Sequence, residues 1–484
     1  MSVYDLVVIG GGINGTGIAR DAAGRGLSVL LVERADLAAA TSSSSSKLIH
    51  GGLRYLEQYE FRLVAESLAE REVLLRIAAH LVWPAQFVMP HVPELRPRWM
   101  IRLGLFLYDH LARRSLLPGS RAVRLDQPPY ASGLRPDLRH GFVYSDCRVD
   151  DARLVVANAC DAAGRGARVL VRTECRSAQR VGGEWRVELS NGETVSARGI
   201  VNAAGPWVKG VLNERLEQPS KDAVRLVKGS HIVLPRQYRG EHAFILQNDD
   251  RRVIFMIPYQ ERYTLVGTTD VPLEGEPADA QASFEEVDYL CRAVGRYLAR
   301  APRPADVVWR YAGVRPLYDD GSADASSVTR DYTLRVDDEA GRAPVLSVFG
   351  GKLTTYRTLA EQVMAKLAPY FPRMGGAWTA GAPFPGSEFA SREQAQSEFF
   401  HRYRGKPAEV LRQVFRRHGT RGTEVLGDGE FGEHYGAGLT ERELRYLMKH
   451  EWAQTAEDVL WRRTKAGLDM SEAQRQRVAE AMAR

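Results

Sequence analysis

The sequence predicts an α/β protein in three parts: a parallel sheet covered by helices, a second part built on an antiparallel sheet, and a helical C-terminal domain. Three observations lead to this prediction. The chain opens with an apolar strand pattern, a glycine-rich turn and a helix pattern. Its middle holds short strand patterns separated by turns rich in Pro, Gly and Asn or Asp, and residues 388–484 are helical in pattern and heavily charged.

The first 33 residues contain the pattern of a dinucleotide-binding turn. Residues 6–9 are an apolar run typical of a strand buried on both faces, and Gly10, Gly12 and Gly15 then match G-x-G-x-x-G. Gly10 permits the tight turn, Gly12 lets the backbone approach a diphosphate, and Gly15 lets the next helix pack against the strand. The diphosphate would bind the amide groups at the N-terminus of that helix.

Glu33 ends the second predicted strand, residues 28–32. It lies about 20 residues after the glycines, where an acidic side chain would bond the ribose hydroxyl of an adenosine. The order of strand, turn, helix, strand and acid favours a dinucleotide site over a simple tight turn. Arg34, beside Glu33, is discordant with an unphosphorylated 2′-hydroxyl, and the motif alone does not separate FAD from NAD.

Composition narrows the class of protein. The 484 residues suffice for two or three domains, and 44% of them are hydrophobic. The four cysteines have no spacing typical of a metal site or a redox pair, which predicts reduced thiols in a cytosolic protein and no metal. The net charge of +6 permits anionic substrates or an anionic membrane surface, while no motif indicates nucleic-acid binding. We expect no signal peptide and no membrane-spanning helix.

The segment TSSSSSK, residues 41–47, is either a flexible linker or a clasp around a cofactor. We favour the clasp, because the segment follows the second strand on the expected cofactor side and continues into LIHGGLRY. Its hydroxyl groups and small residues could wrap a diphosphate and let the chain pass tightly over a ring. The candidate cofactor contacts in this region are Thr41, Ser42, Ser43, Ser46, Lys47, Leu48, His50, Gly51 and Gly52.

Two later turns of small residues also follow predicted strands. NAAGPW, residues 202–207, suits a second approach of the backbone to a nucleotide. The Gly350-Gly351-Lys352 sequence separates a strand from a helix and gives another anion-facing helix N-terminus, although by itself it could be an ordinary βα turn. The remaining candidate cofactor contacts are Asn14, Ala204, Gly205, Gly313, Gly351, Lys352, Leu353 and Thr354.

Residues 57–79 are predicted to form one long amphipathic helix, and residues 83–98 to be irregular or strand-like. Residues 99–114 are apolar, with aromatic residues and arginines. This segment could lie in the plane of a membrane interface, with Trp99, Phe106 and Tyr108 among the headgroups. A buried helix of the second domain is at least as well supported.

Nine motifs occur in order along the chain: GGGINGTG, SSKLIHGGLRYLE, YSDCRVDDARL, NAAGPW, KGSHIV, VGTTD, GVRPL, FGGKLTTYR and WRRTK. Together they resemble the respiratory FAD-dependent glycerol-3-phosphate dehydrogenases over nearly the whole chain. HGGLRYLE and FGGKLTTYR are the specific parts, since GGGINGTG and NAAGPW alone mark only the broader flavin oxidoreductase group that includes the D-amino-acid oxidases.

The resemblance implies an α/β flavoprotein with a Rossmann-like FAD-binding domain of the D-amino-acid-oxidase type, an antiparallel-sheet substrate domain and a helical C-terminal cap domain. The FAD-binding domain would be discontinuous and comprise residues 1–80, 150–210 and 310–370. The substrate-binding domain would comprise residues 81–149 and 211–309, and the α-helical C-terminal domain residues 385–484.

The resemblance further implies oxidation of sn-glycerol 3-phosphate to dihydroxyacetone phosphate by hydride transfer to FAD, with electrons passed to ubiquinone or menaquinone. The protein would then be a cytoplasmic protein, bound peripherally to the cytoplasmic face of the inner membrane, and a homodimer is compatible with it. Residues 96–114 and 461–465 are two candidate membrane patches. Two alternatives stay open: a glycerol-3-phosphate oxidase that uses O2, and a flavin-dependent amine or amino-acid oxidoreductase.

The reaction requires a phosphate-binding group, a proton acceptor and a positive charge near the flavin. The resemblance and the residue chemistry together predict the catalytic residues Arg54, Tyr55, His231, Arg315, Arg330 and Lys352. The three arginines are expected to converge on the substrate, because a guanidinium donates two bonds to one oxyanion. Lys352 would stabilise the reduced flavin, His231 could be the base or a structural histidine, and Tyr55 could bond the substrate or pack under the ring.

Overall fold

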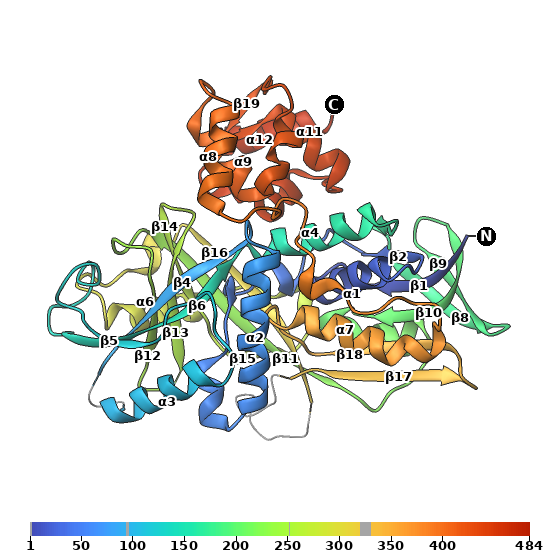
Figure 1. Ribbon diagram of the computed structural model, residues 1–484, viewed down its shortest axis with the longest axis horizontal. Coiled ribbons are helices and arrows are strands. Elements are labelled where there is room, and N and C mark those ends of the chain that lie inside the picture. The colour runs from blue at the N-terminus through green and yellow to red at the C-terminus, as the bar shows by residue number, and fades with distance from the viewer. Residues whose placement is uncertain (1, 93–95, 251, 320–330) are drawn as a thin grey trace.

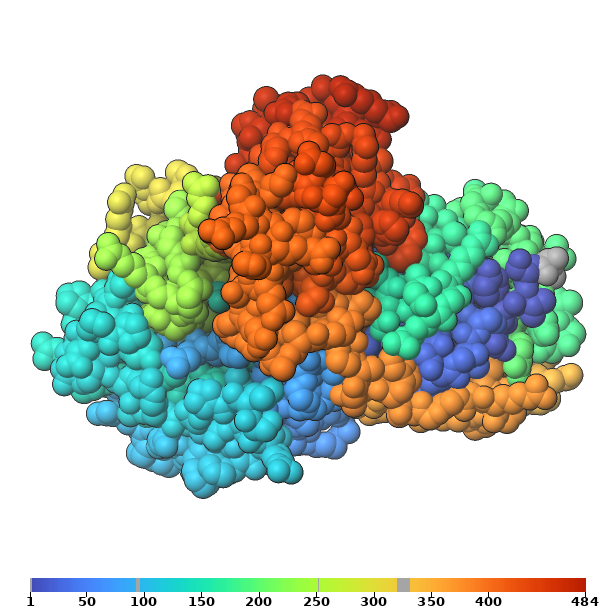
Figure 2. Space-filling view, turned by 45° about the horizontal axis from the view of Figure 1, so that its top comes forward, coloured from blue at the N-terminus to red at the C-terminus, as the bar shows by residue number. Residues whose placement is uncertain are grey.

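The computed structural model describes residues 2–92, 96–250, 252–319 and 331–484 (Figure 1). Two large sheets lie side by side, and the C-terminal domain sits over the middle of the molecule. The space-filling view shows that this domain covers the junction between the two halves (Figure 2).

The first sheet carries the N-terminal glycine turn. Its strand order is β17-β18-β10-β1-β2-β7, with β8 and β9 added as an antiparallel extension of β10. The pairs of β1 with β2, β1 with β10, β10 with β18 and β2 with β7 are parallel. The strands are β1 Val3–Ile9, β2 Val29–Val32, β7 Arg168–Leu170, β8 Cys175–Val181, β9 Glu184–Leu189, β10 Thr194–Asn202, β17 Thr333–Glu339 and β18 Arg342–Phe349.

The buried faces of this sheet explain its apolar sequence. Every residue of β2 is buried, and so are the last four residues of β1, because helices or strands cover both faces. One face packs against α1 Ile13–Gly24, which itself contacts α4 Asp151–Gly164 and α7 Tyr356–Leu367. The predicted strand, glycine turn, helix and strand at the N-terminus are therefore all present.

The second sheet has ten strands in the order β15-β11-β14-β13-β12-β4-β6-β3, with β16 paired to β11 and β5 to β6. All of its pairings are antiparallel except that of β12 with β4. Its strands are β3 Leu48–Ile49, β4 Val82–Pro90, β5 Arg121–Arg124, β6 His140–Val149, β11 Val224–Pro235, β12 Ala243–Gln247, β13 Val253–Tyr259, β14 Tyr263–Gly267, β15 Val271–Pro272 and β16 Trp309–Tyr318.

Helices cover both faces of the second sheet. On one face α6 Phe284–Gly295 packs its buried side chains against the sheet, and a capping box of Ser283 and Glu286 fixes its start. On the other face α2 Phe61–Ile77 and α3 Arg98–His110 contribute to a common apolar cluster with β4, β6 and β13. The expected long helix is thus α2, preceded by a short 3-10 turn, Leu53–Gln58.

Strand pairing refines the expected division of the chain. Residues 310–318, expected in the FAD-binding domain, lie in β16 and pair with β11 of the second sheet, so that Gly313 faces Gly229. Leu48 and Ile49 likewise pair with β6. Both segments join the second sheet because they pair with strands of that sheet. These strands are distant in the sequence, so the local sequence does not contain the pairing.

The C-terminal domain is mainly helical, as expected, with an added two-stranded hairpin. Its helices are α8 Arg392–Arg402, α9 Ala408–His418, α10 Gly422–Leu426, α11 Glu441–His450 and α12 Glu472–Met482, together with the π-helix Asp458–Arg463. The hairpin consists of β19 His434–Gly436 and β20 Leu439–Thr440.

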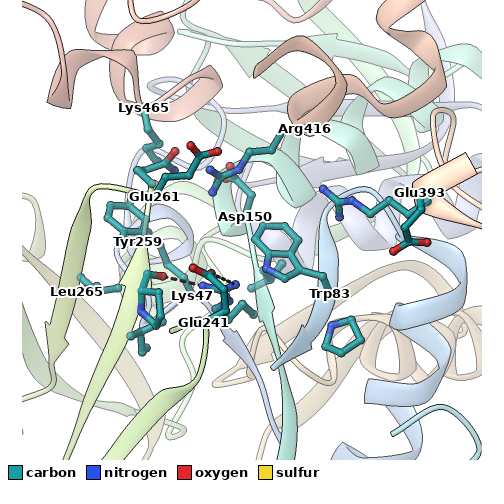
Figure 3. A pocket seen from close by; sticks show the side chains of 17 residues that line it. Lys47, Trp83, Asp150, Glu241, Tyr259, Glu261, Leu265, Glu393, Arg416 and Lys465 are labelled. Atoms are coloured by element: carbon teal, nitrogen blue, oxygen red, sulfur yellow. Dashed lines mark hydrogen bonds and ion pairs between the residues drawn. The ribbon is translucent and has the colours of Figure 1, made fainter. Parts of the chain in front are cut away.

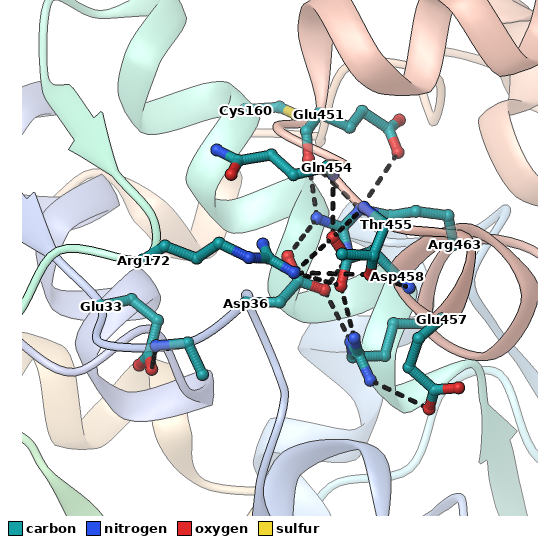
Figure 4. A network of polar contacts seen from close by, with 12 residues as sticks. Glu33, Asp36, Cys160, Arg172, Glu451, Gln454, Thr455, Glu457, Asp458 and Arg463 are labelled. Carbon is teal, nitrogen blue, oxygen red and sulfur yellow. Dashed lines mark hydrogen bonds and ion pairs between the residues drawn. The ribbon is translucent and has the colours of Figure 1, made fainter. Parts of the chain in front are cut away.

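Buried ion pairs attach this domain to the first sheet (Figure 4). Arg463, with no exposed surface, donates to both oxygens of Asp36 at 2.7 Å. Arg172 donates to Asp458 at 3.0 Å, and Arg153 pairs with Glu451. The expectation that residues 461–465 form a membrane patch is therefore wrong: the arginine and lysine charges of this segment are directed into the interior.

Candidate functional site

The glycine turn has a geometry that only glycine adopts without strain. Gly10 has a φ of +114°, and a Cβ placed on it would lie 2.5 Å from the Ala203 carbonyl oxygen. A Cβ on Gly15 would lie 1.9 Å from the Gly10 carbonyl oxygen. The turn therefore brings the N-terminus of α1 close to the strand ends of β1 and β10, which is the arrangement that a diphosphate site requires.

Glu33 lies against this turn. Its carboxylate accepts hydrogen bonds from the amides of Gly11 at 2.6 Å and Ala35 at 2.8 Å. Burial is the largest influence on its pKa and raises it, while the two amide bonds lower it. Arg34 points elsewhere: its guanidinium lies 4.0 Å from the centre of the Trp207 ring, which accounts for the discordant charge beside Glu33.

The serine-rich segment packs directly on the turn. The Ser42 hydroxyl accepts a hydrogen bond from the Ile13 amide at 3.0 Å, and the Thr41 hydroxyl donates to the Val314 carbonyl at 2.5 Å. Lys47 has a φ of +58°, and its ammonium donates to Asp151 at 2.8 Å and to the Ser43 carbonyl at 2.9 Å. These bonds give the segment a defined path over the N-terminus of α1, and they commit the Lys47 charge to Asp151.

One of the two later small-residue turns contacts Asn14. Gly350 and Gly351 both have positive φ, and a Cβ on Gly351 would lie 2.8 Å from the Asn14 side-chain nitrogen. That nitrogen donates to the Gly350 carbonyl at 3.3 Å. The Asn14 oxygen is buried and has no hydrogen-bond partner among the residues that the structure describes. The NAAGPW turn adds Gly205, with a φ of +56°, beside the same strand ends.

Arg54 and Tyr55 lie on the 3-10 turn that follows Gly52, a residue with a φ of +78°. The Lys352 ammonium lies 4.1 Å from the centre of the Tyr55 ring, so the predicted lysine and tyrosine are in contact. The Arg54 side chain is half-buried and makes no ion pair or hydrogen bond with any residue in the described part of the chain. Its guanidinium donors are therefore not taken up by any described residue.

Arg315 has the opposite environment. It lies on β16, and this segment pairs with β11 along its whole length. Its guanidinium pairs with Asp270 and donates to the Thr268 hydroxyl at 3.0 Å. A Cβ on Gly229 would lie 2.3 Å from the guanidinium, so a larger residue there would displace the Arg315 side chain. Arg330, the third predicted arginine, lies outside the described residues.

His231 is 2% exposed, and its ring stacks on Tyr311 with centroids 4.9 Å apart. Its Nε2 atom lies 2.9 Å from the Ser46 hydroxyl, so the predicted base touches the predicted clasp. Burial lowers the pKa of His231 well below 6.5, and the nearby charges of Arg315 and Lys47 add to this effect. The imidazole is therefore neutral at physiological pH and able to accept a proton.

Sequence reasoning missed the acidic residues that hold this region in place. Asp146 is buried and accepts hydrogen bonds from Tyr108 at 2.7 Å, from Arg71 at 2.7 Å and from the Gly51 amide at 3.3 Å. The expectation that Tyr108 faces headgroups is consequently wrong. Asp146 and Asp151 both belong to the SDCRVDD sequence. Its three acidic residues, near the end of a strand, are the pattern from which their role could have been predicted.

Comparisons with known proteins agree with these features. A model of the FAD dependent oxidoreductase family matches residues 5–357, and a model of the C-terminal domain of alpha-glycerophosphate oxidase matches residues 377–484. A glycerol-3-phosphate dehydrogenase of Pseudomonas aeruginosa is 53% identical, over 99% of this chain and 94% of the relative. The aerobic glycerol-3-phosphate dehydrogenase of Escherichia coli is 49% identical, over 99% and 97%.

The chain belongs to the family of FAD-dependent glycerol-3-phosphate dehydrogenases. A member of the family from Brucella abortus, a D-erythritol 1-phosphate dehydrogenase, is 51% identical over 97% of this chain and 96% of the relative. The structure of the glycerol-3-phosphate dehydrogenase from Bacillus halodurans complexed with FAD is 26% identical, with a TM-score of 0.73 over 99% of this chain and 94% of that one. The fold is thus that of an FAD-binding oxidoreductase with a helical C-terminal domain.

FAD is the cofactor of this family, and the residues present fit it. A Cβ on Gly10, Gly15 or Gly351 would collide with neighbouring protein atoms, so the close turns at the expected cofactor position need glycine. The unpartnered oxygen of Asn14 suits a hydroxyl donor of the cofactor. Among the described residues, none form a cluster that could hold a metal ion, and no helix is both long and apolar enough to cross a bilayer.

Proposed function

We propose that this protein oxidises sn-glycerol 3-phosphate to dihydroxyacetone phosphate. The observation that carries the proposal is Arg54, a half-buried arginine without a partner among the described residues, next to the Tyr55–Lys352 contact. It belongs to the HGGLRYLE motif and has the chemistry that a phosphate dianion requires. The names of the relatives at 49–53% identity support the same substrate.

The side chains divide the work between binding, orientation and proton transfer. Arg54 binds the phosphate, and Arg315, held by Asp270 and Thr268, presents a fixed cation to the other end of the substrate. Lys352 places a positive charge where negative charge develops in the transition state. The neutral imidazole of His231 accepts the proton of the C2 hydroxyl. FAD, when bound, supplies the hydride acceptor.

The substrate class can be tested by the colour of the flavin. Glycerol 3-phosphate, added without air, should bleach the flavin absorbance of the holoenzyme, whereas sarcosine and D-alanine should not. The amino acids represent the amine-oxidoreductase alternative, whose substrates lack the phosphate that Arg54 would bind. A flavin that keeps its colour with glycerol 3-phosphate would overturn the proposed substrate.

A second candidate substrate is D-erythritol 1-phosphate, because the relative named for this four-carbon compound is 51% identical to this chain. Both compounds present the same phosphate group and differ in the polyol part. We expect the larger kcat/KM with glycerol 3-phosphate. A larger value with D-erythritol 1-phosphate would transfer the assignment to the four-carbon substrate while leaving the role of Arg54 unchanged.

We further propose that the electrons pass to a membrane quinone, ubiquinone or menaquinone, and that the protein binds peripherally to the cytoplasmic face of the inner membrane. The support is the outer face of α3, which exposes five large apolar side chains: Trp99, Met100, Leu103, Phe106 and Leu107. The opposite face of α3 is buried in the apolar cluster beside the second sheet. A helix half-embedded in this way suits an interface between lipid and water.

The electron acceptor is tested by steady-state rates. A short-chain ubiquinone analogue should support turnover at a much higher kcat than molecular oxygen does. The reverse result would identify the protein as an oxidase. Measuring both rates with the same substrate and the same preparation removes differences in flavin content.

A further inference from the structure

A cavity of about 320 Å³ lies at the seam between the second sheet and the C-terminal domain (Figure 3). Trp83 on β4 and Arg148 on β6 line one side of it. Tyr259, at the end of β13, lines its floor, and Arg392 on α8 and Arg416 on α9 enter from the C-terminal domain. None of these residues belongs to the site proposed for substrate oxidation.

Three guanidinium groups surround the single indole of Trp83. Their central carbons lie 5.9 Å from the ring centre for Arg148, 5.3 Å for Arg392 and 5.6 Å for Arg416. Like charges at such spacing repel one another, and contact with the indole face offsets only about 0.5–1 kcal/mol for each cation at an exposed site. The cluster therefore holds positive charge that the protein does not neutralise at this point.

The pairing of the three arginines supports this conclusion. Arg148 donates to Glu241 at 3.2 Å, but Glu241 also pairs with Arg236. Arg392 donates to the Ala79 carbonyl at 3.2 Å and has no carboxylate within ion-pair distance, considering only described residues. Arg416 makes neither a hydrogen bond nor an ion pair with any described residue. Burial and the charge of Arg416 lower the pKa of Arg392 to about 10.

Three of the four acids on the cavity wall are committed elsewhere, and the fourth, Glu241, pairs with Arg148. Asp150 caps α4 and accepts a hydrogen bond from the Arg153 amide, and Glu261 lies 3.8 Å from Arg412. Glu393 accepts a hydrogen bond from Ser391.

A second, independent feature is an unused donor on the floor. Tyr259 is only 6% exposed, and its hydroxyl has no hydrogen-bond partner in the described part of the chain. Lys465, 4% exposed, lines the same cavity, and burial together with the charge of Lys47 lowers its pKa to about 8. A buried hydroxyl without a partner normally costs free energy, unless a ligand supplies the missing bond.

We propose that this cavity binds the phosphate group of a small phosphate monoester. Guanidinium forks and a phenol hydroxyl are suitable donors for a tetrahedral dianion, and the indole of Trp83 offers an apolar surface for the organic part. The volume is at the lower end of the range of about 300–1,000 Å³ that small-molecule sites occupy, so more than inorganic phosphate can enter. The phosphate contacts Arg392 and Arg416 of the C-terminal domain. It also contacts Arg148 and Tyr259 of the second sheet, and so holds the two parts together.

The location indicates a free metabolite rather than a lipid headgroup. Figure 1 shows α3, the proposed membrane face, at the opposite end of the molecule from the C-terminal domain. A protein lying on a bilayer through α3 would therefore hold this cavity away from the lipid surface. The cavity itself does not depend on the proposed substrate, whereas its distance from the lipid rests on the proposed membrane face.

The test is the melting temperature of the holoenzyme with inorganic phosphate, at an ionic strength held constant with KCl. Phosphate should raise the melting temperature of the wild type. Without phosphate, Arg416→Gln should melt no lower than the wild type, because the change removes repulsion. With phosphate, the Arg416→Gln variant should lose the increase in melting temperature seen in the wild type. Its dissociation constant for phosphate should rise about tenfold, as expected for one charged hydrogen bond.

Two further variants make the result specific. Tyr259→Phe removes only the unpartnered hydroxyl, so it should fold normally and bind phosphate more weakly. Arg402→Gln, at an exposed position of α8, removes the same formal charge outside the cavity and should keep the full increment. Arg54→Ala should also keep it, which separates this cavity from the phosphate site proposed for the substrate.

Several results would overturn the inference. If Arg416→Gln lowered the melting temperature equally with and without phosphate, the arginine would have a structural role only. If the phosphate-dependent increase in melting temperature were lost in Arg54→Ala but kept in Arg416→Gln, phosphate would bind at the catalytic site and not in this cavity. An equal increment from malonate would exclude a phosphate-specific site. Protection through Arg416 by phosphatidic acid vesicles, but not by phosphate, would identify a lipid ligand instead.

Discussion

At the scale of single residues, the site contrasts two arginines of the same predicted function. The Arg315 guanidinium is fixed by Asp270 and Thr268, so it is oriented before a substrate arrives. Arg54 has no such partner among the described residues, so its donors remain for a ligand. The sequence motif identified both positions, but only the structure separates a pre-oriented cation from one that awaits its anion.

Arg54→Ala should lower kcat/KM with glycerol 3-phosphate roughly 10- to 150-fold, because one charged hydrogen-bonding group contributes about 1.5–3 kcal/mol. Flavin content, measured by absorbance, should stay at the wild-type value, since Arg54 makes no bond to the glycine turn. Arg76→Ala, at an exposed position of α2, is the matched control and should have wild-type kinetics. Unchanged kinetics in Arg54→Ala would remove this residue from the site.

The pH dependence of turnover tests His231. The imidazole accepts a proton only when neutral, so activity through this group rises with pH across its pKa. Because burial holds that pKa well below 6.5, the rise should occur on the acidic side of pH 6.5. We expect His231→Asn to lower kcat and to remove this acidic limb. A limb that persists unchanged in the variant would show that another group takes the proton.

At the scale of secondary-structure elements, local sequence patterns predicted the elements that depend on neighbouring residues. They did not predict the pairing of segments that are distant in the sequence. The first strand, the glycine turn, α1 and the second strand follow from residues 4–33, because each depends on neighbours in the chain. The assignment of residues 310–318 to β16 depends on β11, whose paired residues are 78 to 94 positions away, and no local pattern contains it. The WRRTK motif was misjudged for the same reason, since Asp36, which neutralises Arg463, is distant in sequence.

The Arg463–Asp36 pair connects the C-terminal domain to the loop that follows Glu33. Removing one partner of a buried ion pair leaves an uncompensated charge and costs about 3–5 kcal/mol. Arg463→Gln should therefore lower the melting temperature and speed the release of FAD from the holoenzyme, measured by the recovery of flavin fluorescence. Arg477→Gln, which breaks the exposed pair with Glu433, should change neither property measurably. FAD release at the wild-type rate in Arg463→Gln would show that the domain does not stabilise the cofactor loop.

The outer face of α3 makes a separate prediction. Leu103→Ser and Phe106→Ser, combined, should weaken sedimentation with anionic liposomes by at least about tenfold, because each removes an apolar side chain worth roughly 1.5–3 kcal/mol when buried. Turnover with a soluble electron acceptor should not change, as both side chains are exposed. Val181→Ser, an exposed apolar position on β8, serves as the control. Equal sedimentation of all three proteins would exclude α3 as the membrane face.

At the scale of the whole molecule, several buried histidines lie in and around the second sheet and in the C-terminal domain. The pKa values of His80 and His231 lie well below 6.5, and that of His242 is lowered to about 4. Burial is the main cause in each case. His50 and His418 are shifted in the same direction for the same reason. The folded protein thus keeps neutral imidazoles that the unfolded chain would protonate.

This difference predicts a loss of stability in mild acid. Above pH 6.5 the imidazoles are neutral in both states and contribute nothing. Below pH 6.5 the unfolded chain binds protons that the folded chain does not, so each histidine lowers the free energy of unfolding by about 1.4 kcal/mol per pH unit until its folded pKa is reached. Carboxylates with lowered pKa, such as Glu451 at about 2, lose their contribution only below about 4.5. Between these limits the five histidines act against Asp21, Glu33 and Glu66, whose pKa burial raises, and outnumber them.

The melting temperature of the holoenzyme should therefore fall steadily as the pH is lowered from 6.5 towards 4.5. His242→Phe tests the cause, because the ring contacts Tyr130, Tyr238 and Phe244 and its Nε2 atom has no hydrogen-bond partner among described residues. This variant should reduce the slope of the free energy of unfolding against pH by the contribution of one histidine, about 1.4 kcal/mol per pH unit. His434→Gln, at an exposed position, should leave the dependence as it is. If His242→Phe had the wild-type slope, protonation of buried imidazoles would not be the source of the acid sensitivity.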